Sequence, residues 1–254
     1  MRTSHRYGAA PDQEGELWLP SGNGPHPVAV LIHGGFWRAR HRLDLMDALA
    51  ADLQARGLAA WNLEYRRIGA GGGWPATFVD VAAGVDALTV IADAHHLDVT
   101  RMVVAGHSAG GHLALWTAAR ATLPHDAPGA SPRLRPRLAI ALAGVCDLVA
   151  AAERRLGDRA AIELMGASPE AAPDAYALAS PAARLPLGVP QLLVHGTADD
   201  SVPVDVSERY QAAATAAGDR CRLLRLPGVD HFALIDPGSD AWRLTADEIG
   251  AALS

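Results

Sequence analysis

Cysteine is scarce in this chain, since its 254 residues include only Cys146 and Cys221. The two lie far apart and in no C-x-x-C arrangement, which argues against both a disulfide framework and a zinc site. Histidine is more frequent, but the histidines show no H-E-x-x-H or other metal-ligand spacing. We therefore expect the protein to need no metal and no organic cofactor.

The chain also lacks a basic stripe, a signal peptide and a membrane-spanning run. Its formal net charge is −6, which argues against nucleic acid as the main partner. The N-terminal residues have no apolar core of signal-peptide length, and no run approaches the roughly 18 apolar residues of a membrane span. We expect a cytoplasmic protein that binds neither nucleic acid nor membrane, and we leave a homodimer open.

Hydrophobic residues make up half of the chain, which is enough to bury one large core. Short apolar runs alternate with segments that repeat apolar residues at helical spacing. The expected buried strands cover residues 28–33, 58–65, 102–105, 138–143, 191–195 and 222–226. The expected helices cover residues 43–56, 77–92 (capped by Thr77), 204–217 and 240–253. This alternation predicts an α/β fold with a mostly parallel, twisted sheet and helices on both faces.

Two segments depart from the alternation. Residues 1–13 are polar and are expected to extend along the surface before an edge strand over residues 14–19. Residues 147–185 contain short alanine-rich helical pieces interrupted by glycine and proline. We expect residues 147–185 to form a small cap-like insertion over one end of the sheet, within a single domain that covers residues 1–254.

The most informative segment is Gly-His-Ser-Ala-Gly at residues 106–110, between an expected buried strand and an expected helix. This G-x-S-x-G pattern is typical of a sharp strand-to-helix turn that strains the serine backbone and exposes its hydroxyl. The two glycines leave room where a Cβ would clash with the neighbouring strand and helix. Ser108 is therefore the candidate nucleophile, with an ordinary Gly/Ser turn as the alternative.

A serine hydroxyl is a weak nucleophile, so it needs a base and a group that holds the base in the right tautomer. His231, in a glycine-containing loop after the last expected strand, is the candidate base. Asp199, four residues after His195, is favoured as the acid. Asp200 is the main alternative, although it also suits a surface or capping position, and Asp205 is a poorer candidate.

Two loops contain candidate donors for a developing oxyanion. One donor is the backbone N–H of Ala109, directly after the candidate nucleophile. The others are the amides of Gly35 and Phe36, because glycine lets the loop after the strand ending at His33 turn its amides inward. The alternative interpretation of this loop is a simple tight turn.

His33-Gly-Gly-Phe-Trp37 is similar to the H-G-G-x-W signature of the kynurenine formamidase (arylformamidase) branch of the α/β-hydrolases. Related signatures occur in small carboxylesterases and prolyl-oligopeptidase-like hydrolases, and residues 106–111 and 195–203 match the same group. The resemblance implies an α/β-hydrolase fold in which Ser108, Asp199 and His231 form the catalytic triad. It also implies an oxyanion hole, whose amides are those of Gly35, Phe36 and Ala109.

The chain departs from that pattern in two places. The expected first strand lies close to residue 1, which suggests that the leading hairpin common in the superfamily is shortened. His107 stands where hormone-sensitive-lipase-type esterases commonly have aspartate, which argues against that branch.

The sequence says less about which residues bind the substrate. Trp37, Trp74 and Phe232 are the candidate substrate-binding aromatics, as are Tyr65 and Trp116, although aromatic side chains are more often part of the core. Arg66 and Arg67 follow an expected strand and either pair with a substrate carboxylate or bridge acids of the protein.

These features favour a serine hydrolase that cleaves small carboxylic esters or aryl formamides through an acyl-enzyme intermediate. Its expected partner is a small-molecule ester or amide. The alternatives are a prolyl-oligopeptidase-like peptidase and a non-catalytic binding protein on a hydrolase fold.

Overall fold

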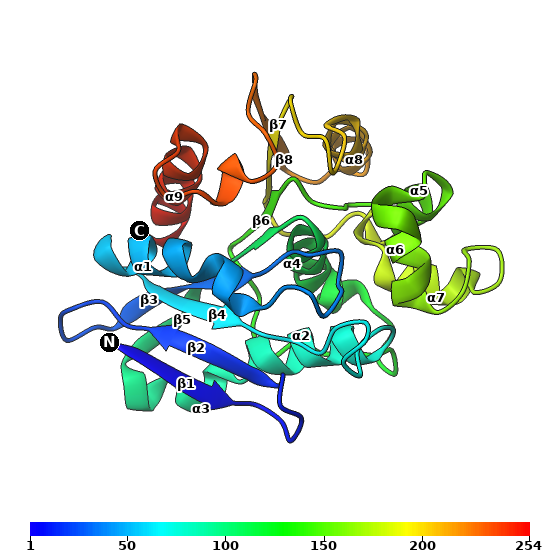
Figure 1. The fold of residues 1–254 in the computed structure, drawn as a ribbon. Coiled ribbons are helices and arrows are strands. Elements are labelled where there is room, and N and C mark those ends of the chain that lie inside the picture. Colours follow the sequence, from blue (N-terminus) through cyan, green and yellow to red (C-terminus); the bar gives the residue numbers. More distant parts are fainter.

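The computed structural model describes residues 1–254 and is built on one eight-stranded sheet, in the order β1-β2-β4-β3-β5-β6-β7-β8 (Figure 1). The strands are β1 (Arg2–Arg6), β2 (Glu14–Trp18), β3 (His26–Ile32), β4 (Ala59–Leu63), β5 (Leu97–His107), β6 (Leu138–Leu142), β7 (Gln191–Gly196) and β8 (Cys221–Leu226). The pairs β1·β2 and β2·β4 are antiparallel, and all other neighbouring strands are parallel. The predicted mostly parallel sheet is confirmed.

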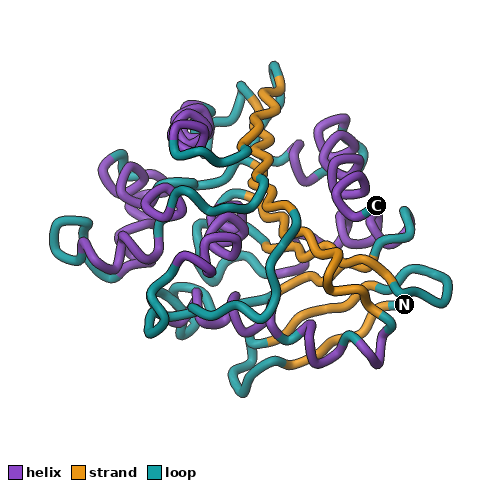
Figure 2. Tube along the Cα trace, turned by 180° about the vertical axis from the view of Figure 1, so that it is seen from behind, coloured by secondary structure: helices purple, strands orange, loops and turns teal.

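Helices cover both faces of the sheet, as the tube view also shows (Figure 2). The helices are α1 (Asp47–Ala55), α2 (Ala76–Asp86), α3 (Leu88–Ile91), α4 (Ala109–Ala119), α5 (Leu148–Glu153), α6 (Leu156–Met165), α7 (Pro173–Ala179), α8 (Asp205–Ala216) and α9 (Asp240–Leu253). Apolar side chains of α1 and α9 pack on one face, and those of α2, α4 and α8 pack on the other. None of the helices is long and apolar enough to cross a membrane.

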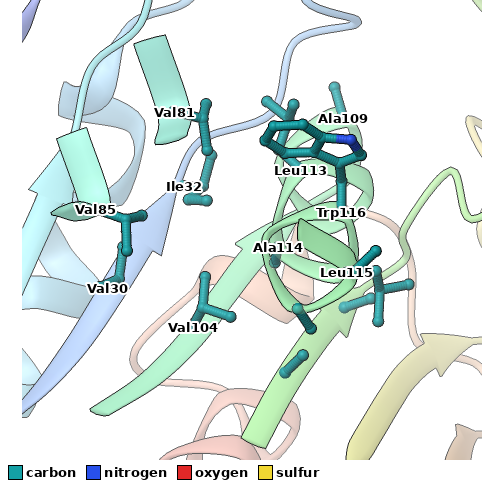
Figure 3. Close-up of a cluster of buried hydrophobic side chains, with 14 of the residues drawn as sticks. Val30, Ile32, Val81, Val85, Val104, Ala109, Leu113, Ala114, Leu115 and Trp116 are labelled. Carbon is teal, nitrogen blue, oxygen red and sulfur yellow. The ribbon is translucent and has the colours of Figure 1, made fainter. Parts of the chain in front are cut away.

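The centre of the sheet is apolar on both faces because β3 and β5 are covered on both sides. Val30, Ile32 and Val104 belong to the core on the side of α2 and α4, and Figure 3 shows Val85 beside Val30 and Val81 beside Ile32. Alternate residues of the same strands belong to the core on the opposite face. Each fully buried aliphatic side chain of this kind stabilises the fold by about 1.5–3 kcal/mol. The strand ends that carry the candidate site are therefore held by a dense core.

Some expectations about local structure were wrong. Arg2–Arg6 forms an edge strand instead of extending along the surface, because its side chains alternate and Arg2 Nε donates to Glu16 in β2 at 2.8 Å. The strand that begins at Glu14 is therefore second from the edge. Thr77 lies inside the first turn of α2 and does not cap it, since its hydroxyl donates to the Arg66 carbonyl at 2.6 Å.

Between β6 and β7 the chain forms α5, α6, α7 and a 3₁₀ helix, Pro181–Arg184, instead of one regular crossover helix. These helices lie together at one side of the molecule (Figure 1). Arg155, Gly157, Asp158 and Arg159 have positive φ angles, so the chain is irregular at the start of α6. A Cβ on Gly157 would lie 2.4 Å from the Phe36 ring, which shows how closely this segment packs on the loop after β3. That it acts as a cap stays a prediction.

Candidate active site

Ser108 lies at the turn between β5 and α4 in a backbone conformation that L residues rarely adopt, with φ 56° and ψ −117°. Its N–H donates to the Leu142 carbonyl at 2.8 Å, which holds the turn against β6. A Cβ on Gly106 would lie 2.1 Å from the Gly110 carbonyl oxygen, and a Cβ on Gly110 would lie 2.0 Å from that of Ile32. Both glycines of the G-x-S-x-G pattern are therefore sterically required.

His231 and Asp199 come from the loops after β8 and β7 and form a tight pair. The Nδ1 of His231 donates to Asp199 Oδ2 at 2.6 Å, and the Asp199 side chain has no exposed surface. The two loops are joined by backbone bonds, such as the one from Ala198 N–H to the Val229 carbonyl at 3.0 Å. With Nδ1 bonded to the carboxylate, the remaining ring nitrogen of His231 is the one available to accept a proton.

The Asp199 carboxylate is kept ionised despite its burial. Burial by itself would raise the pKa of Asp199, but the hydrogen bonds from His195 and His231 outweigh it and hold the pKa well below its usual range. The N–H groups of Ser201 and Val202 also donate to it, at 2.9 and 2.8 Å. Asp200 is exposed, accepts only the Ser201 hydroxyl at 3.2 Å and does not contact His231.

Ser108 and His231 line the same cavity, which has a volume of about 350 Å³ at the carboxyl ends of the strands. Gly35, Phe36 and Phe232 also line it. The structure thus brings together most of the residues that the sequence singled out, although they come from four different loops. Three basic residues that were not predicted to belong to the site, Arg38, Arg40 and His41, also line the cavity.

The two predicted substrate-binding tryptophans do not line this cavity. Trp37 is 1% exposed and packs edge-on against His112, with ring centroids 5.3 Å apart. Trp74 packs against Phe78 with ring centroids 4.9 Å apart. Tyr65 and Trp116 are fully buried, so of the five candidate aromatics only Phe232, which is 57% exposed, lines the cavity.

The loop after β3 has the geometry of an amide nest. Gly35, Phe36 and Trp37 have consecutive positive φ angles of 107°, 51° and 58°, so successive N–H groups turn to one side. The N–H groups of Gly35 and Phe36 donate to no acceptor within the protein. Ala109 is the first residue of α4, where a backbone N–H has no partner inside the helix. These three amides are free to donate to a ligand.

A buried network of charged residues around Glu64, which the sequence did not reveal, packs against the start of this loop at His33. Glu64, directly after β4, has no exposed side-chain surface and lies 2.9 Å from the Nε2 of His33. Burial by itself would raise the pKa of Glu64, but the hydrogen bond from His33 and the charges of His33 and Arg67 lower it overall. Tyr65 stacks on the His33 ring at 4.4 Å and donates to the His33 carbonyl at 3.0 Å.

Arg66 and Arg67 bind acids of the protein, and neither lines the cavity. Arg66 donates to both carboxylate oxygens of Asp80 at 2.7 Å. Arg67 is buried and bridges Glu64 at 3.4 Å and Asp12 at 2.8 Å. Of the two roles considered for these arginines, the structure supports the bridging one.

His107, directly before Ser108, links the serine turn to the histidine loop. Its Nε2 donates to the His231 carbonyl at 3.0 Å, and the two ring centroids are 4.4 Å apart. Burial and the charge of His231 lower the pKa of His107 to about 3, so His107 is neutral at ordinary pH. The sequence showed this histidine only as a departure from another esterase branch.

The BD-FAE family model matches residues 16–213 of the chain. Among curated relatives, the chain is 26% identical over 243 residues to Esterase LipC of Mycobacterium tuberculosis (strain ATCC 25618 / H37Rv), covering 91% of the chain and 59% of the relative. It is also 26% identical over 243 residues to the isoprenylcysteine alpha-carbonyl methylesterase ICME of Arabidopsis thaliana, covering 91% of the chain and 56% of that protein. The chain thus spans only somewhat more than half the length of these relatives.

Solved structures show the same fold at low sequence identity. Esterase B from Lactobacillus rhamnosis (HN001) superposes with a TM-score of 0.85 at 20% identity, covering 99% of this chain and 84% of that one. A truncated carbohydrate esterase from gut microbiota gives a TM-score of 0.83 at 20% identity, covering 99% and 96%. The expected α/β-hydrolase fold is confirmed, whereas assignment to the arylformamidase branch stays a prediction.

Proposed function

The chain belongs to the BD-FAE family, and from this premise we propose that it is a carboxylic ester hydrolase in which Ser108 is the nucleophile. The observation that carries the proposal is the Asp199–His231 pair, with 2.6 Å between Oδ2 and Nδ1, whose histidine lines the same cavity as Ser108. A histidine held by a carboxylate beside a strained serine is the arrangement that general-base activation of a hydroxyl requires.

In the first half of the proposed reaction, His231 Nε2 takes the proton of the Ser108 hydroxyl while Oγ bonds to the ester carbonyl carbon. The carbonyl oxygen becomes an oxyanion and accepts hydrogen bonds from the amides of Gly35, Phe36 and Ala109. Such preorganised donors contribute on the order of 3 kcal/mol each to the transition state. The imidazolium then gives its proton to the departing alkoxide, leaving an acyl-Ser108 ester and a neutral His231.

In the second half, His231 takes a proton from water as the water oxygen attacks the acyl carbon. Collapse of the second tetrahedral intermediate returns the proton to Ser108 Oγ and releases the carboxylic acid. Asp199 stays a carboxylate throughout, because its lowered pKa keeps it ionised, and it stabilises the imidazolium electrostatically. Every proton that His231 takes is returned within the cycle, so the chemistry balances with water as the only co-substrate.

A cavity of about 350 Å³ favours small esters. Phe36, Leu45 and Phe232 supply its apolar surface, and Arg38, Arg40 and His41 supply polar groups. Aryl formamides form the finer part of the proposal, which rests on the resemblance of residues 33–37 to the H-G-G-x-W signature. A formanilide differs in its leaving group, because the departing nitrogen has to be protonated by His231. A specificity constant for N-formylkynurenine far below that for aryl acetates would remove the formamide part and leave the esterase.

The direct test is covalent labelling with a fluorophosphonate probe, combined with hydrolysis of 4-nitrophenyl acetate and butyrate. We expect stoichiometric labelling of the folded protein, and loss of both labelling and hydrolysis in Ser108→Ala. Ser21→Ala, which changes an exposed serine of the β2–β3 loop, is the matched control and keeps both. Absence of labelling in the folded wild-type protein would overturn the proposal in favour of a non-catalytic protein.

A further inference from the structure

A second cavity, larger than the one at Ser108, lies where β1, α2 and α3 come together (bottom of Figure 1). Its volume is about 530 Å³, compared with about 350 Å³ for the Ser108 cavity, and the two share no lining residue. Volumes of this size are typical of sites for small organic ligands. The cavity is therefore separate from the candidate active site.

The floor of this cavity includes an apolar stripe on α2 and α3 whose middle residues are partly buried and whose two end residues are exposed. Val79, Ala83, Ala87 and Val90 recur at helical spacing and all line the cavity. Val79 is 40% exposed and Val90 is 74% exposed. Single exposed apolar residues are ordinary, but a stripe of them that lines one concave surface is the pattern of a binding site.

The rim carries positive charge that the protein does not neutralise. Asp86, the only acid of the lining, is occupied by the Arg120 guanidinium at 3.1 and 2.6 Å. The Arg6 guanidinium donates only to the carbonyls of Ala9 and Ala10, at 3.1 and 2.7 Å. The exposed Arg133 side chain forms no ion pair, although the Arg133 backbone N–H donates to Asp86 Oδ1 at 3.2 Å. On a chain with a net charge of −6, two guanidinium groups that form no ion pair beside an apolar floor are a local exception.

We propose that this cavity, defined by the apolar stripe Val79–Val90 and the rim arginines Arg6 and Arg133, binds small monocarboxylates with an aromatic or branched apolar body. The apolar body packs on the stripe, and the carboxylate accepts charge-assisted hydrogen bonds from the guanidinium groups. Acids released by hydrolysis of aryl and acyl esters belong to this chemical class. The proposal does not depend on the function proposed for Ser108, since the two cavities are separate.

The test is isothermal titration calorimetry with 1-naphthoate and with its uncharged isostere, 1-naphthamide. We expect the wild-type protein to bind naphthoate at least tenfold more tightly than naphthamide. In Arg6→Ala/Arg133→Ala the affinity for naphthoate falls at least tenfold, or about 1.4 kcal/mol, while naphthamide binding is unchanged. Ala83→Trp, which fills the cavity from α2, abolishes binding of both compounds.

The matched controls change the same residue types elsewhere on the surface. Ala213→Trp on α8 and Arg209→Ala/Arg225→Ala, whose arginines are 76% and 59% exposed, are expected to bind both compounds as the wild type does. Equal affinity for naphthoate and naphthamide, or wild-type binding by a folded Ala83→Trp variant, would overturn the proposal. If Ala83→Trp does not fold, the arginine double variant decides, because its two changes are on the surface.

Discussion

Two buried carboxylates, Glu64 and Asp199, each form a pair with a histidine of a neighbouring loop at the carboxyl ends of the strands, and only the histidine of the second pair lines the cavity. Glu64 and His33 follow β4 and β3, and Asp199 and His231 follow β7 and β8. The shortest nitrogen–oxygen distances are 2.9 Å and 2.6 Å, and neither carboxylate has exposed side-chain surface. In both pairs the hydrogen bond from histidine helps to lower the pKa of a carboxylate whose burial acts in the opposite direction.

The two pairs differ in what surrounds them. The Nδ1 of His33 lies 2.8 Å from the Gly34 carbonyl, so both of its ring nitrogens are occupied. Arg67 and Arg42 also approach Glu64, at 3.4 and 3.3 Å. His231 has one nitrogen on Asp199 and the other free at the cavity, and no arginine pairs with Asp199. A buried carboxylate–histidine pair is suited to proton transfer only when the second nitrogen is free, and otherwise it serves as a structural clamp.

The largest expected effect is on turnover, and it distinguishes His231 from His33. His231→Gln is expected to lower the turnover of 4-nitrophenyl acetate by roughly 10⁶-fold, because no other group can take the Ser108 proton. His33→Gln is expected to lower the unfolding midpoint in urea while keeping most of the turnover per folded molecule. Comparable losses of turnover in the two folded variants would contradict the distinction between a reactive pair and a clamp.

The next effect concerns the acid of the reactive pair. Asp199→Asn keeps the shape of the side chain but loses the charge that stabilises the imidazolium, so turnover is expected to fall roughly 10⁴-fold. The neighbouring Asp200→Asn is the matched control, and less than about a tenfold change is expected because Asp200 does not contact His231. If Asp200→Asn lost its turnover and Asp199→Asn kept it, the catalytic acid would be Asp200 and not Asp199.

For the Glu64–His33 clamp, the expected effect of a substitution is on the free energy of unfolding. Glu64→Gln removes the buried negative charge next to His33 and leaves the buried Arg67 with Asp12 as its remaining carboxylate partner. It is expected to reduce the free energy of unfolding by about 3 kcal/mol. Glu248→Gln breaks an ion pair with Arg222 at 2.9 Å, in which the arginine side chain is 63% exposed, and is expected to cost about 0–1 kcal/mol. Urea denaturation at neutral pH measures both, and equal losses would show that Glu64 is not a clamp.

His112 is a buried histidine that pairs with no carboxylate, and it should make the stability of the protein depend on pH. His112 lies among Trp37 and Phe78, with the Ala179 carbonyl 2.9 Å from its Nε2. Burial lowers the pKa of His112 to about 4, and burial with the charge of His231 lowers that of His107 to about 3. Because the unfolded chain binds protons that the folded one does not, stability is expected to fall as pH decreases from about 6.5 to 4.

The variant His112→Gln removes one of these titrating groups. It is expected to reduce the slope of unfolding free energy against pH by up to about 1.4 kcal/mol per pH unit between pH 6 and 4.5. Urea titrations at half-unit steps of pH give the slope for both proteins. An unchanged slope in the variant would mean that His112 titrates in the folded protein as it does in the unfolded one.

The sequence alone was enough to predict the sheet type, most element positions and the Ser108 turn, because these depend on local physics. Apolar periodicity over a few residues distinguishes buried strands from helices. The requirement for glycine at Gly106 and Gly110 follows from the steric demands of one short turn. The chain order and the loop positions of Asp199 and His231 also predicted that these two residues would pair as acid and base.

Tertiary structure decided which side chains meet. In the sequence Glu64 is one polar residue near the end of the expected strand 58–65, and only the packing of the loops around it makes it the centre of a buried network. His107 finds the His231 carbonyl, and Trp37 is buried against His112 instead of lining the cavity, because segments far apart in the chain are pressed together by the core. Local patterns determine which conformations the backbone adopts, whereas partners, burial and hence pKa depend on contacts that no short segment contains.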